Sequence, residues 1–414
     1  MPSALSPLRA PLSRLVLPGV ALFAVGLACL AAREPVTTVS APLVRFDTTH
    51  LSESDVRDRD IAFYDRRVSA DPQGAADRVT LASLLLSRSR HSGSTADLAR
   101  AESLATASVA LRTVRNAHAL EVLASVQMAR HAFRDAHRAA AAADSIEPGN
   151  ASHLALLGEI ELELGEYAAA DSHFRAVRTT RDQFTVGARL ARWYELTGRS
   201  ARARTILQDA ITAVDLRDDL PREQVAWFHY RLGELELRVG RLAAADSAFQ
   251  RGLVRNPDDI RLLGGLARTA LARHDWKAAA AYGDRATLIQ LDPATLGVVS
   301  EAYAALGDST QATSFAGAMA ASALSEGNAM HRAWGMHLLD HGTPAQRAEV
   351  LRRARADIRE RSDVYGHDML AWALYRDGQL DAARREMALA VAQGTEDVML
   401  DRHAQVLLRG TPMR

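Results

Sequence analysis

Apolar and small residues recur along this chain with a period near 34, and this pattern predicts helices. A bulky apolar residue precedes a small one, a glycine or histidine follows seven positions after the small residue, and an alanine follows five positions later, as in Leu157-Gly158, Gly165 and Ala170. The glycine or histidine falls at His131, Gly165, Gly198, Gly240, His274, Gly307, Gly342, Gly378 and Gly410. The steps between these positions range from 32 to 42 residues, which is typical of stacked helical repeats.

The clearest unit indicates how each repeat packs. Gly158 and Ala170 lack bulk where two helices of a hairpin cross, and Tyr167 and Phe174 fill the space between hairpins. Gly165 can take the left-handed conformation that ends the first helix. His131 and His274 hold the same place in their units; a histidine there could titrate near neutral pH, but the shared position favours a cap on the last helical carbonyls.

The pattern resembles the tetratricopeptide repeat from near Gly74 to the C terminus. One unit carries Leu232-Gly233, Gly240, Ala245, Phe249 and Pro257, and the next carries Leu266-Ala267, Trp276, Ala279, Ala286 and Pro293. The resemblance implies an all-α fold, an α-solenoid of roughly nine hairpins forming a right-handed superhelix. It also implies that the first helices line an inner groove that binds protein partners.

The chain is expected to divide into three parts. Residues 1–32 are expected to be a signal peptide or membrane anchor, residues 33–58 a flexible spacer rich in Thr, Ser, Pro and Val, and residues 59–414 the solenoid. Within the solenoid, a lone helix is expected over 60–69, the repeats over about 74–394, and a C-terminal capping helix over about 396–410. The 42-residue step predicts a lengthened loop or helix end at 215–221.

The N-terminal segment has the features of an export signal. Arg9 and Arg14 precede an uncharged run from Leu15 to Ala32. Cys29 is the single cysteine, and residues 25–28 before it resemble a bacterial lipobox, which makes Cys29 a candidate lipidation site. An uncleaved anchor and cleavage after residue 31 or 32 are the alternatives. Each one predicts export across the inner membrane, with the body on the periplasmic side as a lipoprotein, an anchored protein or a free one.

Composition and motifs argue against several classes of function. The 50 basic and 50 acidic residues balance, so nucleic acid is not an expected partner. The sequence contains no phosphate-binding loop, no His-Glu-x-x-His motif and no Gly-x-Ser-x-Gly elbow. We therefore expect no enzyme activity, no catalytic residues and no cofactor.

One pair of histidines is a candidate metal site. His337 and His341 are four residues apart, so they share a helix face and could chelate, with His331 as a less well placed third ligand. The alternative is a chance spacing among fourteen histidines. Because no carboxylate motif with the expected spacing accompanies the pair, metal binding is a minor alternative function, and no metal site is assigned.

The expected function is that of a non-enzymatic scaffold or adaptor in the bacterial cell envelope that binds a protein or extended peptide. The alternative is a structural spacer or oligomerisation module. By repeat register, the candidate groove residues are Glu159, Glu163, Arg192, Glu195, Tyr230, Glu234, Arg238, Arg268, Trp372, Tyr375 and Arg376. The aromatic and arginine side chains among them are types enriched at binding hot spots, although a large aromatic at helical spacing is more often core.

Overall fold

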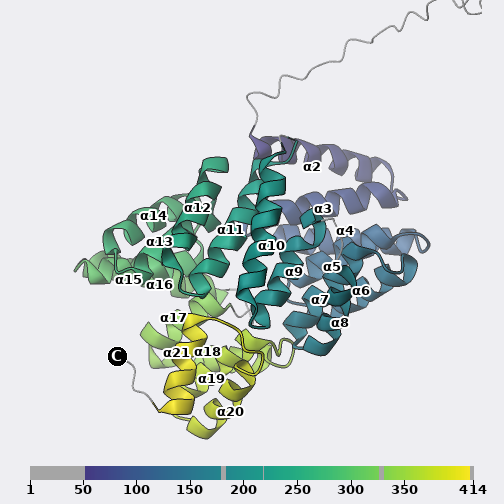
Figure 1. Ribbon diagram of the computed structural model, residues 1–414. Helices are drawn as coiled ribbons and strands as arrows, with labels where there is room; N and C mark the ends of the chain where they lie inside the picture. The colour runs from purple at the N-terminus through teal and green to yellow at the C-terminus, as the bar shows by residue number, and fades with distance from the viewer. Residues whose placement is uncertain (1–51, 179–182, 218, 326–330, 411–414) are drawn as a thin grey trace, which may run out of the picture. The chain divides into compact units, whose positions relative to one another are not determined.

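The computed structural model describes residues 52–178, 183–217, 219–325 and 331–410. These ranges contain twenty α-helices and no strand (Figure 1). The helices are α2 (Glu53–Ala70), α3 (Ala75–Ser92), α4 (Thr95–Leu111), α5 (Ala117–Ala129), α6 (Phe133–Ile146), α7 (Ala151–Leu164), α8 (Tyr167–Val177), α9 (Gln183–Leu196), α10 (Ser200–Asp215), α11 (Arg222–Arg238), α12 (Leu242–Arg255), α13 (Ile260–Ala272), α14 (Trp276–Ile289), α15 (Pro293–Ala305), α16 (Ser309–Ser325), α17 (Arg332–His341), α18 (Pro344–Asp357), α19 (Val364–Arg376), α20 (Leu380–Ala390) and α21 (Val398–Arg409).

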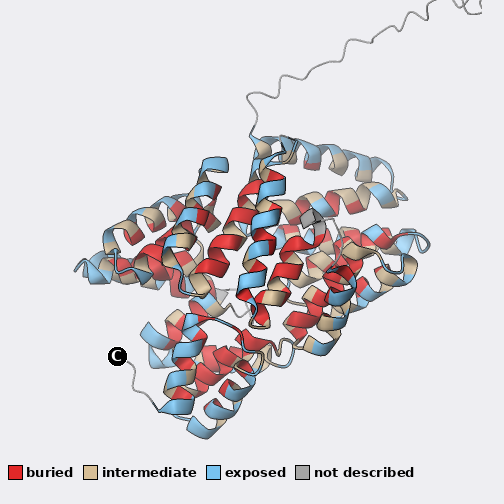
Figure 2. Ribbon diagram, in the orientation of Figure 1, coloured by how far each residue is buried: buried red, intermediate tan, exposed pale blue. Residues whose placement is uncertain are grey.

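Consecutive helices pair into hairpins. The pairs run from α3 with α4 to α19 with α20, and the second helix of most hairpins packs on the first helix of the next. Buried positions form stripes on the helix faces that meet these neighbours (Figure 2). The predicted fold class, an all-α solenoid of tetratricopeptide-like hairpins, is confirmed.

Left-handed residues end the first helices, as the repeat pattern predicts. Gly165 has φ 76°, and His131 and His274 have φ 60° in the same structural place. The backbone N–H of His131 donates to the carbonyl of Met128 at 3.0 Å, and His274 makes the equivalent bond at 2.9 Å. The cap expected of these histidines is therefore made by their backbone amides. Gly342 differs, with φ −73°, and the Thr343 side chain caps α18 there.

Small residues make room for aromatic rings within and between the hairpins. A Cβ on Gly158 would lie 2.6 Å from the Phe174 ring. Gly233 and Gly265 face the ring of Phe249 in the same way. Both phenylalanines are fully buried. The absence of a side chain at these glycines therefore allows the neighbouring helices to pack closely around the two rings.

One boundary differs from the sequence expectation. Helix α2 begins at Glu53 rather than residue 60, because Ser52 and Asp55 form a capping box, and its first turns therefore occupy part of the expected spacer. At the long step, where a lengthened loop or helix end is expected at 215–221, α10 ends at Asp215 and α11 begins at Arg222, so the extra residues lie in longer helices as well as in their connection.

The C-terminal hairpin contacts the turns of hairpins in the middle of the chain. The hydroxyl of Ser362 donates to the carbonyl of Leu164 at 2.7 Å, and that of Thr395 donates to the carbonyl of Leu196 at 2.5 Å. The backbone N–H of Val364 donates to the hydroxyl of Tyr167 at 2.9 Å. These contacts hold the segments that flank the α19–α20 hairpin against the C-terminal ends of the first helices α7 and α9.

The expected export signal and Cys29 lie outside the described residues. Among the helices that the structure does describe, none combines the length and apolarity needed to cross a membrane.

Glycine substitutions can test the C-terminal contact. Gly198 and Gly307 both have positive φ, but an added Cβ would overlap the carbonyl oxygen of Gly394 only at Gly198, whereas nothing lies within 4 Å of Gly307. Both alanine variants bear a backbone cost of roughly 1–2 kcal/mol, and G198A adds an overpacking cost of about 1–3 kcal/mol. We expect a lower urea midpoint for G198A than for G307A; equal midpoints would contradict the contact.

Candidate binding surface on the inner face

The predicted groove residues lie on the first helices of successive hairpins. Four of them, Glu159, Arg192, Glu234 and Arg268, each stand six positions before the turn residue of their unit, and Glu301 holds the same position in its own unit. Neighbouring units alternate in charge at this register, and one adjacent pair bonds directly, with Arg268 2.5 Å from Glu234. The predicted register is therefore a line of ion-pairing side chains.

Glu195 of α9 is the centre of this ionic surface. Its buried carboxylate bonds Arg192 at 3.0 Å and Arg231 at 3.4 Å, and it also bonds Arg238. Burial alone would raise the pKa of Glu195, but Arg238, Arg192 and Arg231 hold it at about 2. The carboxylate is therefore ionised at neutral pH and joins α9 to α11.

The same network extends to Glu234. Arg238 lies 3.3 Å from the Glu234 carboxylate while it also bonds Glu195. Burial would raise the pKa of Glu234, but Arg268 and Arg238 lower it below its usual range. Four predicted residues, Glu195, Glu234, Arg238 and Arg268, thus form one continuous chain of charge-assisted bonds.

Tyr365 of α19 covers the centre of the network. The guanidinium groups of Arg332, Arg192 and Arg238 lie 4.6, 5.3 and 5.8 Å from its ring centroid. Burial raises the pKa of Tyr365 to about 12, and its hydroxyl has no hydrogen-bond partner among the described residues. This part of the expected groove is therefore occupied by the chain's own C-terminal hairpin.

A second cluster near the same junction is rich in carboxylates. Arg361 lies 3.1 Å from both Glu163 and Asp363. Burial raises the pKa of Glu163, which Arg361 lowers and Asp363 raises further. Burial also raises the pKa of Asp357 to about 6, with Arg361 opposing and Asp363 adding to the rise. The cluster therefore favours binding of a proton.

Another part of the inner face remains open to solvent. Glu159 bonds Arg189 at 2.7 Å, with both side chains about a quarter to a third exposed. The Arg261 guanidinium lies 5.7 Å from the ring of the half-buried Tyr230. Arg90 is exposed and has no ion pair with any described residue. Although its side chain is exposed, the protein around it partly desolvates the guanidinium and lowers its pKa; the charges of Arg189 and Arg261 lower the pKa further, and Glu159 opposes the shift.

Three predicted groove residues near the C terminus form a different contact. The Trp372 side chain is fully buried, and its indole N–H donates to Asp340 at 2.9 Å. Arg376 lies 3.4 Å from the same carboxylate, and Tyr375 stacks on Trp372. This burial corrects the expectation that Trp372 is an accessible anchor, because the indole belongs to the core between α17 and α19.

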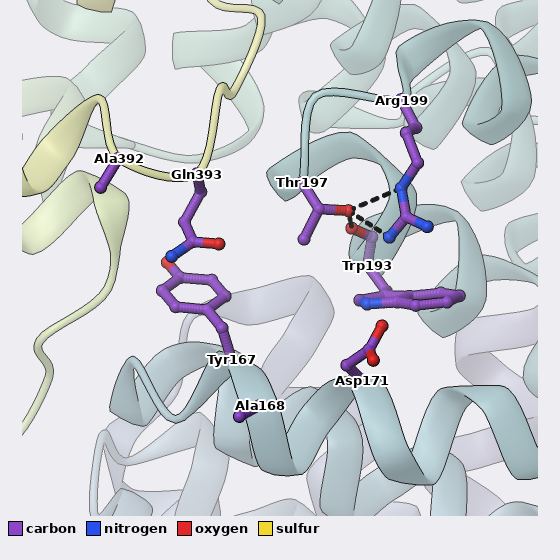
Figure 3. Close-up of a pocket in the computed structure, with 8 residues that line it drawn as sticks. All are labelled: Tyr167, Ala168, Asp171, Trp193, Thr197, Arg199, Ala392 and Gln393. Atoms are coloured by element: carbon purple, nitrogen blue, oxygen red, sulfur yellow. Dashed lines mark hydrogen bonds between the residues drawn. The ribbon is translucent and has the colours of Figure 1, made fainter.

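A cavity of about 440 Å³ lies where the turn between α9 and α10 meets the chain after α20. Figure 3 shows Tyr167 and Gln393 on one side and the Trp193 indole, with the Arg199 guanidinium beside it, on the other. Arg199 lies 4.2 Å from the Trp193 ring centroid and donates to the Thr197 hydroxyl. The buried indole N–H of Trp193 has no partner among the described residues.

The sequence did not single out this cavity. Trp193 and Arg199 flank a turn glycine in the repeat, a place where the pattern predicts packing. The wall at Gln393 comes from a segment about 200 residues later, and no local spacing reveals that approach.

The structure adds a carboxylate to the candidate histidine pair. Glu301 of α15 lies 2.8 Å from His337 and 3.5 Å from His341. His331 lies elsewhere, where its ring contacts that of His131 at 4.9 Å. Glu301 belongs to the preceding hairpin, so no local spacing in the sequence links it to the two histidines.

Comparison with known proteins gives similarities of fold only. No family model matches the chain, and no curated protein matches it. Solved structures similar to it include PilW, a type IV pilus biogenesis factor, at 20% identity over 51% of this chain and 94% of that one, with a TM-score of 0.41. PilF of Pseudomonas aeruginosa matches at 17% identity over 48% and 88%, with a TM-score of 0.40. Human IFIT1, solved as a dimer with m7Gppp-AAAA, matches at 12% identity over 82% and 77%, with a TM-score of 0.49.

Neutralising Glu195 tests the central network. E195Q would leave the partly buried Arg192, Arg231 and Arg238 without their shared anion, at an expected cost of about 3–5 kcal/mol in unfolding free energy. Because the folded pKa is depressed to about 2, this stabilisation is present above about pH 4.5 and is lost as pH falls toward 2. Urea unfolding at pH 7 and pH 3 measures both effects.

The matched control is D219N, which removes an exposed carboxylate paired with Arg217 at 2.6 Å. Exposed pairs contribute about 0–1 kcal/mol, so D219N should leave the unfolding midpoint nearly unchanged. A similarly small effect of E195Q would mean that the inner network does not hold the hairpins together.

Asp357 should have the opposite pH dependence. Its raised pKa means that the folded state loses stability as pH rises from about 4 through 6, where the carboxyl ionises against Asp363 and Glu163. D357N removes that cost and should stabilise the protein at pH 7.5 by on the order of 1–2 kcal/mol, with little effect at pH 4. Thermal unfolding across this range, with D381N at an exposed position as the control, measures it; a gain independent of pH would contradict the assignment.

Proposed function

We propose that this chain is a non-enzymatic interaction scaffold that binds a protein or an extended peptide on the open part of its inner face. The observation that carries this proposal is the accessible set of Arg90, Arg189, Tyr230, Arg261 and Arg268. Carboxylates hold most of these side chains in position, while Arg90 has no ion pair among the described residues.

The chemistry of this surface favours an acidic partner. Arg189, Arg261 and Arg268 each have one acidic neighbour, Glu159, Asp259 and Glu234 respectively. Arg90, which makes no ion pair with a described residue, adds a further positive charge near Arg189 and Arg261. A guanidinium whose geometry is already fixed loses less freedom when it binds a carboxylate, so an Asp or Glu side chain of the partner is the expected contact. Tyr230 adds an aromatic surface beside it.

The proposal that the protein is located in the bacterial cell envelope is supported by the sequence of its N-terminal segment. The basic, then uncharged, N-terminal segment and the lipobox-like residues before Cys29 support export and attachment to a membrane. Under this proposal the scaffold presents its inner face on the periplasmic side of the inner membrane.

One observation favours the alternative role in oligomerisation. Val254, Leu288 and Leu291 are apolar and 81%, 88% and 61% exposed near the ends of α12 and α14. The Arg285 guanidinium reaches the carbonyl of Pro257 at 3.4 Å, which places these helix ends beside each other. An exposed apolar surface of this kind suits a second copy of the chain.

Site-specific crosslinking distinguishes the two roles. A photoreactive amino acid at position 230 should give an adduct of discrete mass with another protein in the native cell, identified by mass spectrometry. The same residue at position 288 should give none with that protein. An adduct between two copies from position 288, with none from position 230, would support oligomerisation and contradict binding on the inner face.

Arginine variants test the contact itself. R90A removes the arginine without breaking an ion pair to a described residue, so the fold should persist while the adduct from position 230 falls by about tenfold, the equivalent of about 1.4 kcal/mol. R202A, at an exposed position on α10, is the matched control and should leave the yield unchanged. If R90A and R202A gave equal yields of the adduct, Arg90 would not be part of the binding site.

A further inference from the structure

Two histidines and a glutamate converge between α15 and α17. The Nδ1 atom of His337 lies 2.8 Å from Oε1 of Glu301, and Nε2 of His341 lies 3.5 Å from the same oxygen. One ligand atom from each of the three residues can be chosen so that all lie within 4.8 Å of one another. The His337 side chain is 10% exposed, whereas that of His341 is 55% exposed, so the site opens to solvent on one side.

This arrangement differs from another histidine–glutamate group in the chain. His137 and His173 also flank a glutamate, Glu161, but they contact different carboxylate oxygens, at 3.3 Å and 2.7 Å. That carboxylate lies between the two rings, and its hydrogen bond raises the pKa of His173, as in an ordinary ion pair. At Glu301 both imidazole nitrogens instead approach the same oxygen, Oε1, so a single ion could contact that oxygen and both nitrogens.

The dimensions suit a tetrahedral metal ion. Zinc–nitrogen and zinc–oxygen bonds near 2.0–2.1 Å place tetrahedral ligand atoms about 3.4 Å apart. The distances from Glu301 to His337 and His341 lie on either side of this value, and the exposed His341 has room to adjust. Three protein ligands leave a fourth position, which here would face solvent.

The backbone of α15 holds the first ligand in place. A Cβ on Gly297 would lie 3.2 Å from the ring atoms of His337, closer than an ordinary contact. Glycine at this position therefore lets the imidazole lie against α15, one turn before Glu301. The carboxylate and the histidines come from different hairpins, so an ion here would join α15 to α17.

We propose that Glu301, His337 and His341 bind one divalent zinc ion, which links the hairpin of α15 to that of α17. Imidazole nitrogens and a carboxylate oxygen are ligands that zinc accepts. The ion would replace the direct bond between Glu301 and His337, and it would stabilise a part of the array where α17 is a short helix of 10 residues. This inference is independent of the partner-binding surface.

Calorimetric titration of the full chain with zinc chloride tests the proposal. The protein is purified without a polyhistidine tag and dialysed against a chelator beforehand. We expect one zinc ion per chain and a rise in the melting temperature on zinc addition. H341A and E301Q should each weaken zinc affinity by more than tenfold, since even outer-shell partners of a metal contribute about 10–100-fold.

H118A is the matched control. His118 is 67% exposed and lies 3.8 Å from Glu121, so it provides an exposed histidine beside a glutamate that belongs to no three-ligand group among the described residues. This variant should bind zinc like the original protein. The proposal is overturned by a titration that shows no stoichiometric binding, by H341A and E301Q binding as tightly as the original, or by loss of binding in H118A. The first result would leave only the direct contacts of Glu301 with the two histidines.

Discussion

The three-way bond of Glu195 with Arg192, Arg231 and Arg238 is the interaction on which the inner face depends. A buried charge is tolerable only when it is paired and hydrogen-bonded. Each first helix brings charged side chains inward, so the helices must approach at distances that let opposite charges meet. The apolar contacts between hairpins supply stability, while this network selects the register at which α9 and α11 face each other.

The same constraint divides the inner face into closed and open parts. Arg192 and Arg332 lie near the face of the Tyr365 ring, which attracts their positive charge. Arg332 also forms ion pairs with Asp368 and Asp397 of the C-terminal region. The hydrogen bond from Ser362 to the carbonyl of Leu164, at the end of α7, helps to keep the C-terminal helices over this part of the inner face. Where no C-terminal helix covers the arginines, around Arg189, the side chains stay accessible to a partner.

Local spacing predicted the parts of the fold that one hairpin determines. The left-handed conformation of Gly165 and His131 follows from ending one helix and starting another, so it can be read from a single unit. The bond between Arg268 and Glu234 could be anticipated from alternation between adjacent units. The cover by Tyr365 could not, because it joins residues about 170 positions apart whose meeting depends on small rotations accumulated over several hairpins. Trp372 shows a second limit, since an aromatic at helical spacing can face a groove or a core with the same sequence pattern.

The residue six positions before the turn shows how repeats with one packing plan acquire different chemistry. Glu159, Glu234 and Glu301 share this position, and each bonds a side chain of a first helix, namely Arg189, Arg268 and His337. An arginine keeps its proton at all physiological pH values, so the first two bonds can only be ion pairs. A neutral imidazole has a lone pair to donate, so the third bond can be exchanged for coordination of an ion. Because the backbone positions are equivalent, the identity of the partner side chain alone decides whether the carboxylate serves the rigidity of the array or a site within it.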